Sequence, residues 1–262
     1  MNILIPIITL GSLGLMFGLW LVFANKIFAV KTDPRIEQIL NVLPGANCGA
    51  CGNAGCQGYA AALIKGEAEI SNCPPGGIET QLEISKILGV AVKETTKQTA
   101  TLICGGGSRC DNKYNYTGPK TCTAADILLG GEKSCSFACI GFGDCLRICP
   151  FDAIRIGEDN LPIIDKSKCT ACGKCVKICP KNVLILSPAD KQYHINCNST
   201  DKGAAVMKAC KVGCIGCGKC KNVCPSGAIT IENNLAKIDY NKCTNCGECI
   251  KVCPTKAIKE RI

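Results

Sequence analysis

The sequence predicts an α+β protein that combines one membrane-spanning helix, a small cysteine-rich domain and two small modules related by duplication. Three observations predict this arrangement. The chain has 25 cysteines among 262 residues, and its residues 3–23 form an uncharged, mostly apolar run. The cysteine spacing between Cys122 and Cys149 also recurs between Cys197 and Cys224. We therefore expect the cysteines, rather than one large apolar core, to organise the chain.

The first element is a predicted transmembrane helix at residues 1–26. Residues 3–23 carry no charged side chain, and about 20 apolar residues are enough to cross a bilayer as a helix. A cleaved signal peptide would start with basic residues, and none is present here. The first basic residues follow at Lys26, Lys31 and Arg35. The positive-inside rule therefore predicts a single pass through the cell (inner) membrane, with the rest of the chain on the cytoplasmic side.

The predicted span offers a surface on which another membrane helix could pack. Gly14 and Gly18 form a GxxxG spacing, which allows close approach of two helices. Glycine is also common in membrane helices in general, so both interpretations stay open. The span contains no ionisable residue, so we do not expect this chain by itself to conduct an ion.

A small domain, residues 27–100, is predicted to follow the span. Its first helix begins at Asp33-Pro34, because proline fits the first turn, and ends before Pro44-Gly45. A second helix is expected at residues 57–65. Residues 79–101 predict a helix and then a strand that pack over this domain.

The same domain contains four cysteines with the spacing CxxCxxxxCx16C. They are Cys48, Cys51, Cys56 and Cys73. Gly49, Gly52 and Gly55 lie between the first three and let the backbone fold tightly around a bulky inorganic group. Four cysteines without histidine predict one [4Fe-4S] cluster at this place.

Four later stretches end in CxxxCP, and three of them extend to CxxCxxCxxxCP. This is the ligand pattern of two-cluster bacterial ferredoxins, in which three cysteines hold one cluster and the fourth binds the neighbouring cluster. Three sites follow from this crossed rule. They are Cys169, Cys172 and Cys175 with Cys149; Cys214, Cys217 and Cys220 with Cys253; and Cys243, Cys246 and Cys249 with Cys224.

Between the two cysteine runs of each repeat we predict a β-hairpin. The hairpins cover residues 154–164, with a turn at 157–160, and residues 229–238, with a turn at Asn233-Asn234. A short helical stretch is expected at residues 124–129.

The predicted segments are a transmembrane helix (1–26), an amino-terminal [4Fe-4S] domain (27–100), a cysteine-containing connecting segment (101–134), a first ferredoxin-like module (135–187), a linker (188–209) and a second ferredoxin-like module (210–262).

The first repeat departs from the pattern at Phe142, which stands where the second repeat has Cys217. The site formed by Cys139, Cys145 and Cys179 then lacks one ligand, and we expect Cys135 to replace it. This gives five [4Fe-4S] clusters. A sixth would form if Cys104, Cys110 and Cys122 gather around a fourth thiolate. Otherwise these cysteines, with Cys197 and Cys210, would be buried free thiols.

Other uses of cysteine fit the sequence less well. A disulfide framework is typical of short secreted chains with an even number of cysteines. Structural zinc usually takes separated CxxC pairs, often with histidine, and the single histidine, His194, lies outside every motif.

The formal net charge of +9 is offset by about −2 for each bound cluster. Basic residues form no block and aromatic residues are few, so we expect no nucleic-acid partner.

The whole chain resembles the B subunit of the Rnf complex. The resemblance is carried by the amino-terminal span, the run of residues 43–56 (LPGANCGACGNAGC) and the ferredoxin modules behind it. It implies a membrane complex that oxidises reduced ferredoxin, reduces NAD and moves Na⁺ or H⁺. It also implies that this subunit receives the electrons of ferredoxin, with NADH and flavin chemistry on other subunits. The sequence has no GxGxxG nucleotide motif.

The sequence thus predicts an electron-transfer subunit with reduced ferredoxin, other Rnf subunits and the lipid bilayer as partners, and with no substrate-converting site of its own. We expect electrons to enter at the carboxy-terminal modules and to reach the Cys48 site beside the span. Two alternatives remain at this point. The chain could be a membrane-tethered carrier that acts alone, or a corrinoid-linked activator, because the Cys48 motif also resembles iron-sulfur domains of corrinoid proteins.

Overall fold

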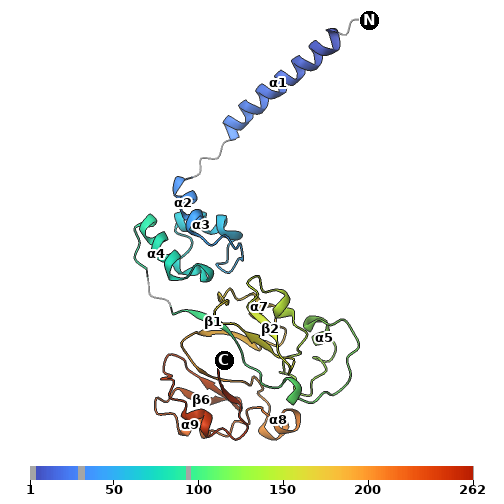
Figure 1. Cartoon of the computed structure of the whole chain (residues 1–262), viewed down its shortest axis with the longest axis vertical. Helices are drawn as coiled ribbons and strands as arrows, with labels where there is room; N and C mark the ends of the chain where they lie inside the picture. The colour runs from blue at the N-terminus through green and yellow to red at the C-terminus, as the bar shows by residue number, and fades with distance from the viewer. Residues whose placement is uncertain (1–3, 29–32, 93–95, 262) are drawn as a thin grey trace.

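The computed structural model describes residues 4–28, 33–92 and 96–261. Figure 1 shows helix α1 extending away from a small helical domain, with the cysteine-rich remainder of the chain beyond that domain. The described strands form four separate two-stranded sheets. The fold is therefore mixed helix and strand, as the sequence predicts, with the longest helices in the amino-terminal part of the chain.

Helix α1 (Leu4–Phe28) includes the predicted membrane segment. Its stretch Ile7–Phe28 is long and apolar enough to cross a membrane, and none of its most apolar window is buried against the rest of the protein. Leucine, isoleucine and phenylalanine side chains project around its whole circumference. Helix–helix packing within the described chain therefore does not account for this apolar surface, and a bilayer would.

The small domain consists of α2 (Pro34–Val42), α3 (Gly55–Lys65), α4 (Gly77–Leu88) and two single-turn 3₁₀ helices, η1 (Ile70–Asn72) and η2 (Pro74–Gly76). Asp33 caps α2 by accepting a hydrogen bond from the Arg35 amide at 2.9 Å. Ile39, Tyr59 and Ile84 are fully buried between the three α-helices. The buried Tyr59 hydroxyl donates to the Glu69 carbonyl at 2.7 Å, which fixes the segment leading to Cys73.

The first module begins earlier in the chain than the sequence predicts. Strand β1 (Gln98–Leu102) pairs antiparallel with β4 (Leu184–Pro188), and so the prediction that it packs over the small domain was wrong. Thr101 and Ser187 share a buried hydrogen bond of 2.6 Å between their hydroxyls, which favours this pairing. The other elements of this half are η3 (Gly107–Arg109), α5 (Cys122–Ile127), α6 (Asp144–Arg147), β2 (Ile154–Ile156), β3 (Pro162–Ile164) and α7 (Lys174–Ile178).

The second module has the same plan. Strand β5 (Tyr193–Ile195), which lies in the predicted linker, pairs antiparallel with β8 (Ile258–Glu260). The remaining elements are α8 (Gly203–Ala209), α9 (Lys219–Asn222), β6 (Ile229–Glu232), β7 (Leu235–Ile238) and α10 (Glu248–Lys251). In both modules the last strand, β4 or β8, pairs with a strand that comes before the cysteine runs of that module. This partner is β1 in the first module and β5 in the second.

The two predicted hairpins are confirmed. Strand β2 pairs with β3, and β6 pairs with β7. At the tip of the second hairpin, Asn233 and Asn234 both have positive φ angles, of 50° and 62°. A two-residue turn with two positive φ angles matches the twist of the strands, and asparagine tolerates it better than most residues.

Arg261 fastens the end of the second module to the first module. Its guanidinium donates to the carbonyls of Thr99 and Ala100, at 3.3 and 3.1 Å, and also to the Thr101 hydroxyl. A further bond of 3.0 Å reaches the Pro188 carbonyl. One side chain thus contacts both β1 and β4, and these bonds hold the carboxy-terminal strand against the first module.

Replacing Arg261 should loosen this contact. We expect Arg261→Ala to lower the free energy of unfolding by about 1–3 kcal/mol, because partly buried carbonyls lose charged donors. The midpoint of anaerobic thermal unfolding measures the effect. Lys237→Ala is the matched control, since Lys237 forms only an exposed ion pair with Glu232 and should change stability by less than about 1 kcal/mol. Equal losses in the two variants would contradict the role of Arg261.

His194 should make stability depend on pH. Burial, followed by the positive charge of Arg261, lowers the pKa of His194 from 6.5 to about 4. Between these two pH values the unfolded chain binds more protons than the folded chain. The contribution of His194 to the free energy of unfolding therefore has its full value above pH 6.5 and decreases as the pH falls toward 4. Compared with His194→Gln, the wild type should lose about 1 kcal/mol more between pH 7.5 and 5.5. Thermal unfolding at both pH values tests this, and parallel losses would refute it.

Candidate metal centres

Five cavities in the structure are each lined by four cysteines. The N site has Cys48, Cys51, Cys56 and Cys73; site 1A has Cys122, Cys139, Cys145 and Cys179; site 1B has Cys149, Cys169, Cys172 and Cys175; site 2A has Cys214, Cys217, Cys220 and Cys253; and site 2B has Cys224, Cys243, Cys246 and Cys249. Sites 1B, 2A and 2B contain the ligand sets that the crossed rule predicts. The N site contains the four cysteines of the amino-terminal motif.

In the modules, a glycine and a single turn of helix place the third cysteine of each run. Gly143, Gly173, Gly218 and Gly247 all have φ near 75° and directly precede α6, α7, α9 and α10. The left-handed conformation turns the chain sharply after the preceding ligands, which glycine does without steric cost. The helix that follows carries a buried cysteine on its first turn. Local sequence therefore builds most of each cavity.

In the N site the side chain of Asn47 helps to shape the cavity. The Asn47 Oδ1 accepts a hydrogen bond of 2.8 Å from the Cys56 amide, which closes the loop around the cavity. Gly55 has a φ of 79°, and a Cβ there would lie 2.7 Å from Asn47 Oδ1. Both the conformation and the close approach therefore require glycine at this position.

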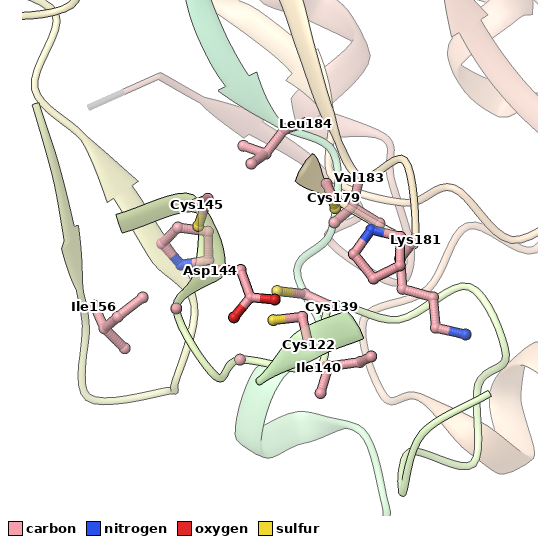
Figure 2. Close-up of a pocket in the computed structure, with 14 residues that line it drawn as sticks. Cys122, Cys139, Ile140, Asp144, Cys145, Ile156, Cys179, Lys181, Val183 and Leu184 are labelled. Carbon is pink, nitrogen blue, oxygen red and sulfur yellow. The ribbon is translucent and has the colours of Figure 1, made fainter. Parts of the chain in front are cut away.

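Site 1A corrects one prediction. Its fourth cysteine is Cys122 and not Cys135. Figure 2 shows Cys122 beside Cys139 and Asp144, with Cys145 and Cys179 around the same cavity. The cause is a contact between α5 and α6, in which the Thr123 amide donates to Asp144 Oδ2 at 3.1 Å. This contact brings the first residue of α5 to the position that Cys217 occupies in the second repeat.

Phe142, the residue that replaces the expected cysteine, has a packing role. Its ring lies 5.6 Å from the Tyr116 ring, centroid to centroid. Tyr116, Ala125 and Ile140 form a small buried cluster to which Phe142 and Cys122 contribute. The aromatic ring therefore supports the helix that carries the substitute cysteine.

Cys135 lies in a different cysteine group, outside the five cavities. It interacts with Cys104 and Cys210, while Cys110 pairs with Cys210 across an isolated β-bridge. Cys104, Cys110, Cys135 and Cys210 are named the junction group below. The twenty-fifth cysteine, Cys197, interacts with both Cys214 and Cys135. The predicted trio of Cys104, Cys110 and Cys122 does not assemble, because Cys122 belongs to site 1A.

Burial disfavours the anionic form of several thiols in these cavities. Burial, followed by neighbouring cysteines, raises the pKa of Cys145 and Cys220 to about 11 and that of Cys175 to about 12. Burial also raises the pKa of Cys73, in the N site. Metal ligation requires thiolates, so the positive charge of bound metal must offset both burial and mutual repulsion.

Some backbone amides point at the sulfurs. The Ala257 amide donates to Cys253 Sγ at 3.3 Å, and the Ala100 amide donates to Cys169 Sγ at 3.4 Å. Such N–H groups stabilise charged thiolate and are among the features that set the reduction potential of an iron-sulfur cluster. Strand β1 therefore contributes to site 1B although it lies far from the cysteine run in sequence.

The residues present fit iron-sulfur clusters better than single metal ions. All 25 cysteines are free thiols, and every cavity offers four of them. Within residues 4–28, 33–92 and 96–261, no group of three or more histidine, cysteine or acidic residues is compact enough for one ion. The cavities have empty volumes of about 300–400 Å³. An all-cysteine donor set spread around such a cavity is typical of [4Fe-4S] ligation.

Two family models match the chain. The first, described as "Putative Fe-S cluster", matches residues 43–75, and the second, described as a 4Fe-4S dicluster domain, matches residues 138–183 and 213–257. These ranges contain every cysteine of the N site and sites 1B, 2A and 2B. Cys122, Cys197 and the junction group lie outside them.

Curated relatives cover nearly the whole chain. The B subunit of an ion-translocating oxidoreductase complex from Methanosarcina acetivorans is 42% identical over 256 residues, which is 97% of both chains. The B subunit of the Na⁺-translocating ferredoxin:NAD⁺ oxidoreductase complex of Acetobacterium woodii is 45% identical over 92% of this chain and 73% of the relative. This chain belongs to the family of Rnf B subunits.

A third Rnf relative, the B subunit of the proton-translocating ferredoxin:NAD⁺ oxidoreductase complex of Clostridium ljungdahlii, is 43% identical over 92% of this chain and 86% of the relative. Membership of this family and the two 4Fe-4S matches establish the chain as an iron-sulfur electron-transfer subunit of an ion-translocating complex. The prediction of the family from the sequence is confirmed.

Site 1A gives a direct test of its fourth ligand. We expect Cys122→Ala to lose up to about four iron atoms per chain, because the remaining three cysteines of the site cannot complete a cubane. The equivalent residue of the second repeat, Cys197, is the matched control, since site 2A has four cysteines without it. Iron and acid-labile sulfide are measured on anaerobically purified protein. Full iron in Cys122→Ala would exclude Cys122 as a ligand.

Proposed function

We propose that this chain receives electrons from reduced ferredoxin at its second module and passes them to the small domain beside the membrane helix. Other subunits of the complex then reduce NAD and move Na⁺ or H⁺. The five cavities would each hold a [4Fe-4S] cluster through the four cysteines that line it. When bound, such a cluster takes up and releases single electrons.

Exposure of the ligands supports the entry point. Of the 25 cysteines only Cys217 and Cys246 are exposed, and they belong to sites 2A and 2B. A protein donor must approach a centre closely, and these two sites have the least protein between ligand and solvent. This is the observation that carries the proposal. The cysteines of the first module are buried or half-buried.

The proximity of cysteines in neighbouring sites supports a continuous route between the sites. In the first module, Cys145 of site 1A lies close enough to Cys175 of site 1B to shift its pKa upward. Cys172 of site 1B interacts in the same way with Cys48 of the N site. The N site belongs to the domain that follows α1. Sites 1A, 1B and N therefore form a series that ends in the domain next to the membrane segment.

The names of the relatives support the donor and acceptor. Those from Acetobacterium woodii and Clostridium ljungdahlii belong to ferredoxin:NAD⁺ oxidoreductase complexes, one Na⁺-translocating and one proton-translocating. We propose the same donor and acceptor for this chain, with a single pass of α1 through the cell membrane and the cysteine-rich domains on the cytoplasmic side. NAD and flavin chemistry would lie on other subunits. Family membership favours this function over a carrier that acts alone and over a corrinoid-linked activator.

The direction of transfer can be tested at the N site. We expect Cys48→Ala to abolish NAD reduction by the membrane complex, because the last centre before the membrane is lost. Reduced ferredoxin should still bleach the visible absorbance of the remaining centres at the wild-type rate. Cys246→Ala, at the opposite end of the series, should slow that bleaching. Stopped-flow absorbance under anaerobic conditions separates the two steps. An equal loss of ferredoxin oxidation in Cys48→Ala would contradict the direction.

A further inference from the structure

Four cysteines that belong to none of the five cavities meet between the two modules. They come from three separate parts of the chain: the loop at residues 104–110, residue 135 and residue 210. Cys104 and Cys110 are buried and lie in one cluster with the half-buried Cys135 and Cys210. We propose that this junction group, Cys104, Cys110, Cys135 and Cys210, holds a sixth [4Fe-4S] cluster that connects the modules.

The backbone sets two of these sulfurs side by side. Cys110 and Cys210 are partners in an isolated antiparallel β-bridge. The bridge is extended on both sides, because the Asp111 amide donates to the Ala209 carbonyl at 3.2 Å and the Lys211 amide donates to the Arg109 carbonyl at 3.2 Å. Cys210 directly follows α8 of the second module. The end of this helix therefore places Cys210 beside Cys110 of the first module.

Gly106 lets three cysteine side chains approach the backbone closely. A Cβ at this position would lie 3.7 Å from Cys104 Sγ, 3.6 Å from Cys210 Sγ and 3.1 Å from the Cβ of Cys110. The side chains of Cys104 and Cys110, from the same loop, and of Cys210, from the second module, therefore lie close around Gly106.

Cys135 completes the group. Its backbone amide faces the Cys110 sulfur, and its own sulfur interacts with Cys104 and Cys210. The loop is held in place because the Ser134 amide donates to the Asp111 carbonyl at 2.7 Å. The group therefore offers four cysteine sulfurs, which is the number that a cubane needs.

The surroundings suit a negatively charged centre. The Cys139 amide donates to Cys104 Sγ at 3.3 Å, in the manner of the amides that face sites 1B and 2A. Arg109 interacts favourably with Cys210, and the Lys133 ammonium contacts the Cys110 carbonyl at 3.4 Å. A [4Fe-4S] cluster with four thiolates carries about −2. The ammonium of Lys133 offsets part of this charge, whereas Arg109 is also paired with Asp159, and Asp111 and Asp201 add negative charge nearby.

The junction group lies between site 1A of the first module and site 2A of the second, where a cluster could pass electrons between the modules. Cys104 lies against Cys139 of site 1A, and Cys135 interacts with Cys197, which in turn neighbours Cys214 of site 2A. The junction group thus lies between the leading sites of the two modules. A cluster there would carry electrons from the second module to the first, and its four bonds would also fasten the modules together.

Cys197 is the natural control for this assignment. It is half-buried like Cys135 and Cys210, and it lies close to Cys135. In the repeat it corresponds to Cys122, but site 2A already has Cys217 in the place of Phe142. Cys197 is therefore left as a free thiol, and its loss should leave every cluster in place.

The test is the metal content of the anaerobically purified full chain. We expect about 24 iron and 24 sulfide per wild-type chain, which corresponds to six cubanes. The double variant Cys110→Ala/Cys210→Ala should have about 20 of each, and Cys197→Ala should keep about 24. Zinc is measured in the same samples. Ferredoxin takes no part in this experiment, so an error in the proposed donor would not alter the result.

Three outcomes would overturn the proposal. They are a wild-type content of about 20 iron, about one zinc per chain in place of the missing four iron, or a loss of about four iron in Cys197→Ala. If the double variant does not fold, the wild-type iron and zinc contents decide the matter alone. Low-temperature spin resonance of the reduced protein gives a second readout, since losing the junction centre should weaken the magnetic coupling between the two modules.

Discussion

The structure depends on the charge balance between cysteine sulfur and bound metal. Burial and mutual repulsion both oppose thiolates in the cavities, so four of them can share one space only when metal supplies positive charge. The apolar cores are correspondingly small and contain the ligands themselves, as in the cluster of Ile229, Ile258 and Cys249. We therefore expect cluster binding and folding of the modules to be coupled, with the short helices and hairpins holding the cysteines in place more than forming an independent core.

Features encoded locally were predictable from the sequence. The cysteines that line sites 1B, 2A and 2B follow from the spacing and the crossed rule, because three cysteines of a run surround one cavity and the fourth reaches the neighbouring cavity. The hairpin turn at Asn233-Asn234 and the start of α2 at Asp33 are also local signals. Family membership could be predicted because the motif at residues 43–56 and the paired runs occur in one chain.

Features that depend on distant contacts were not predictable. The choice of Cys122 for site 1A depends on the bond between Thr123 and Asp144, and no spacing rule contains that contact. The junction group depends on a β-bridge between Cys110 and Cys210, which lie far apart in the sequence. The pairing of β1 with β4 was missed for the same reason. The repeated gap from Cys122 to Cys135 indicated that both cysteines belong to the unit, but it could not show which cavity each one enters.

The strands that complete each module have a consequence for how the modules could be separated. Strand β1 lies before the first pair of cysteine runs and β5 before the second, yet each pairs with the strand that follows the last Cys-Pro of its module. A fragment cut at the first cysteine of a run would leave a sheet edge unpaired, and exposed edges promote aggregation. Excised modules should therefore start at residues 96 and 189, well ahead of the ligands that define them.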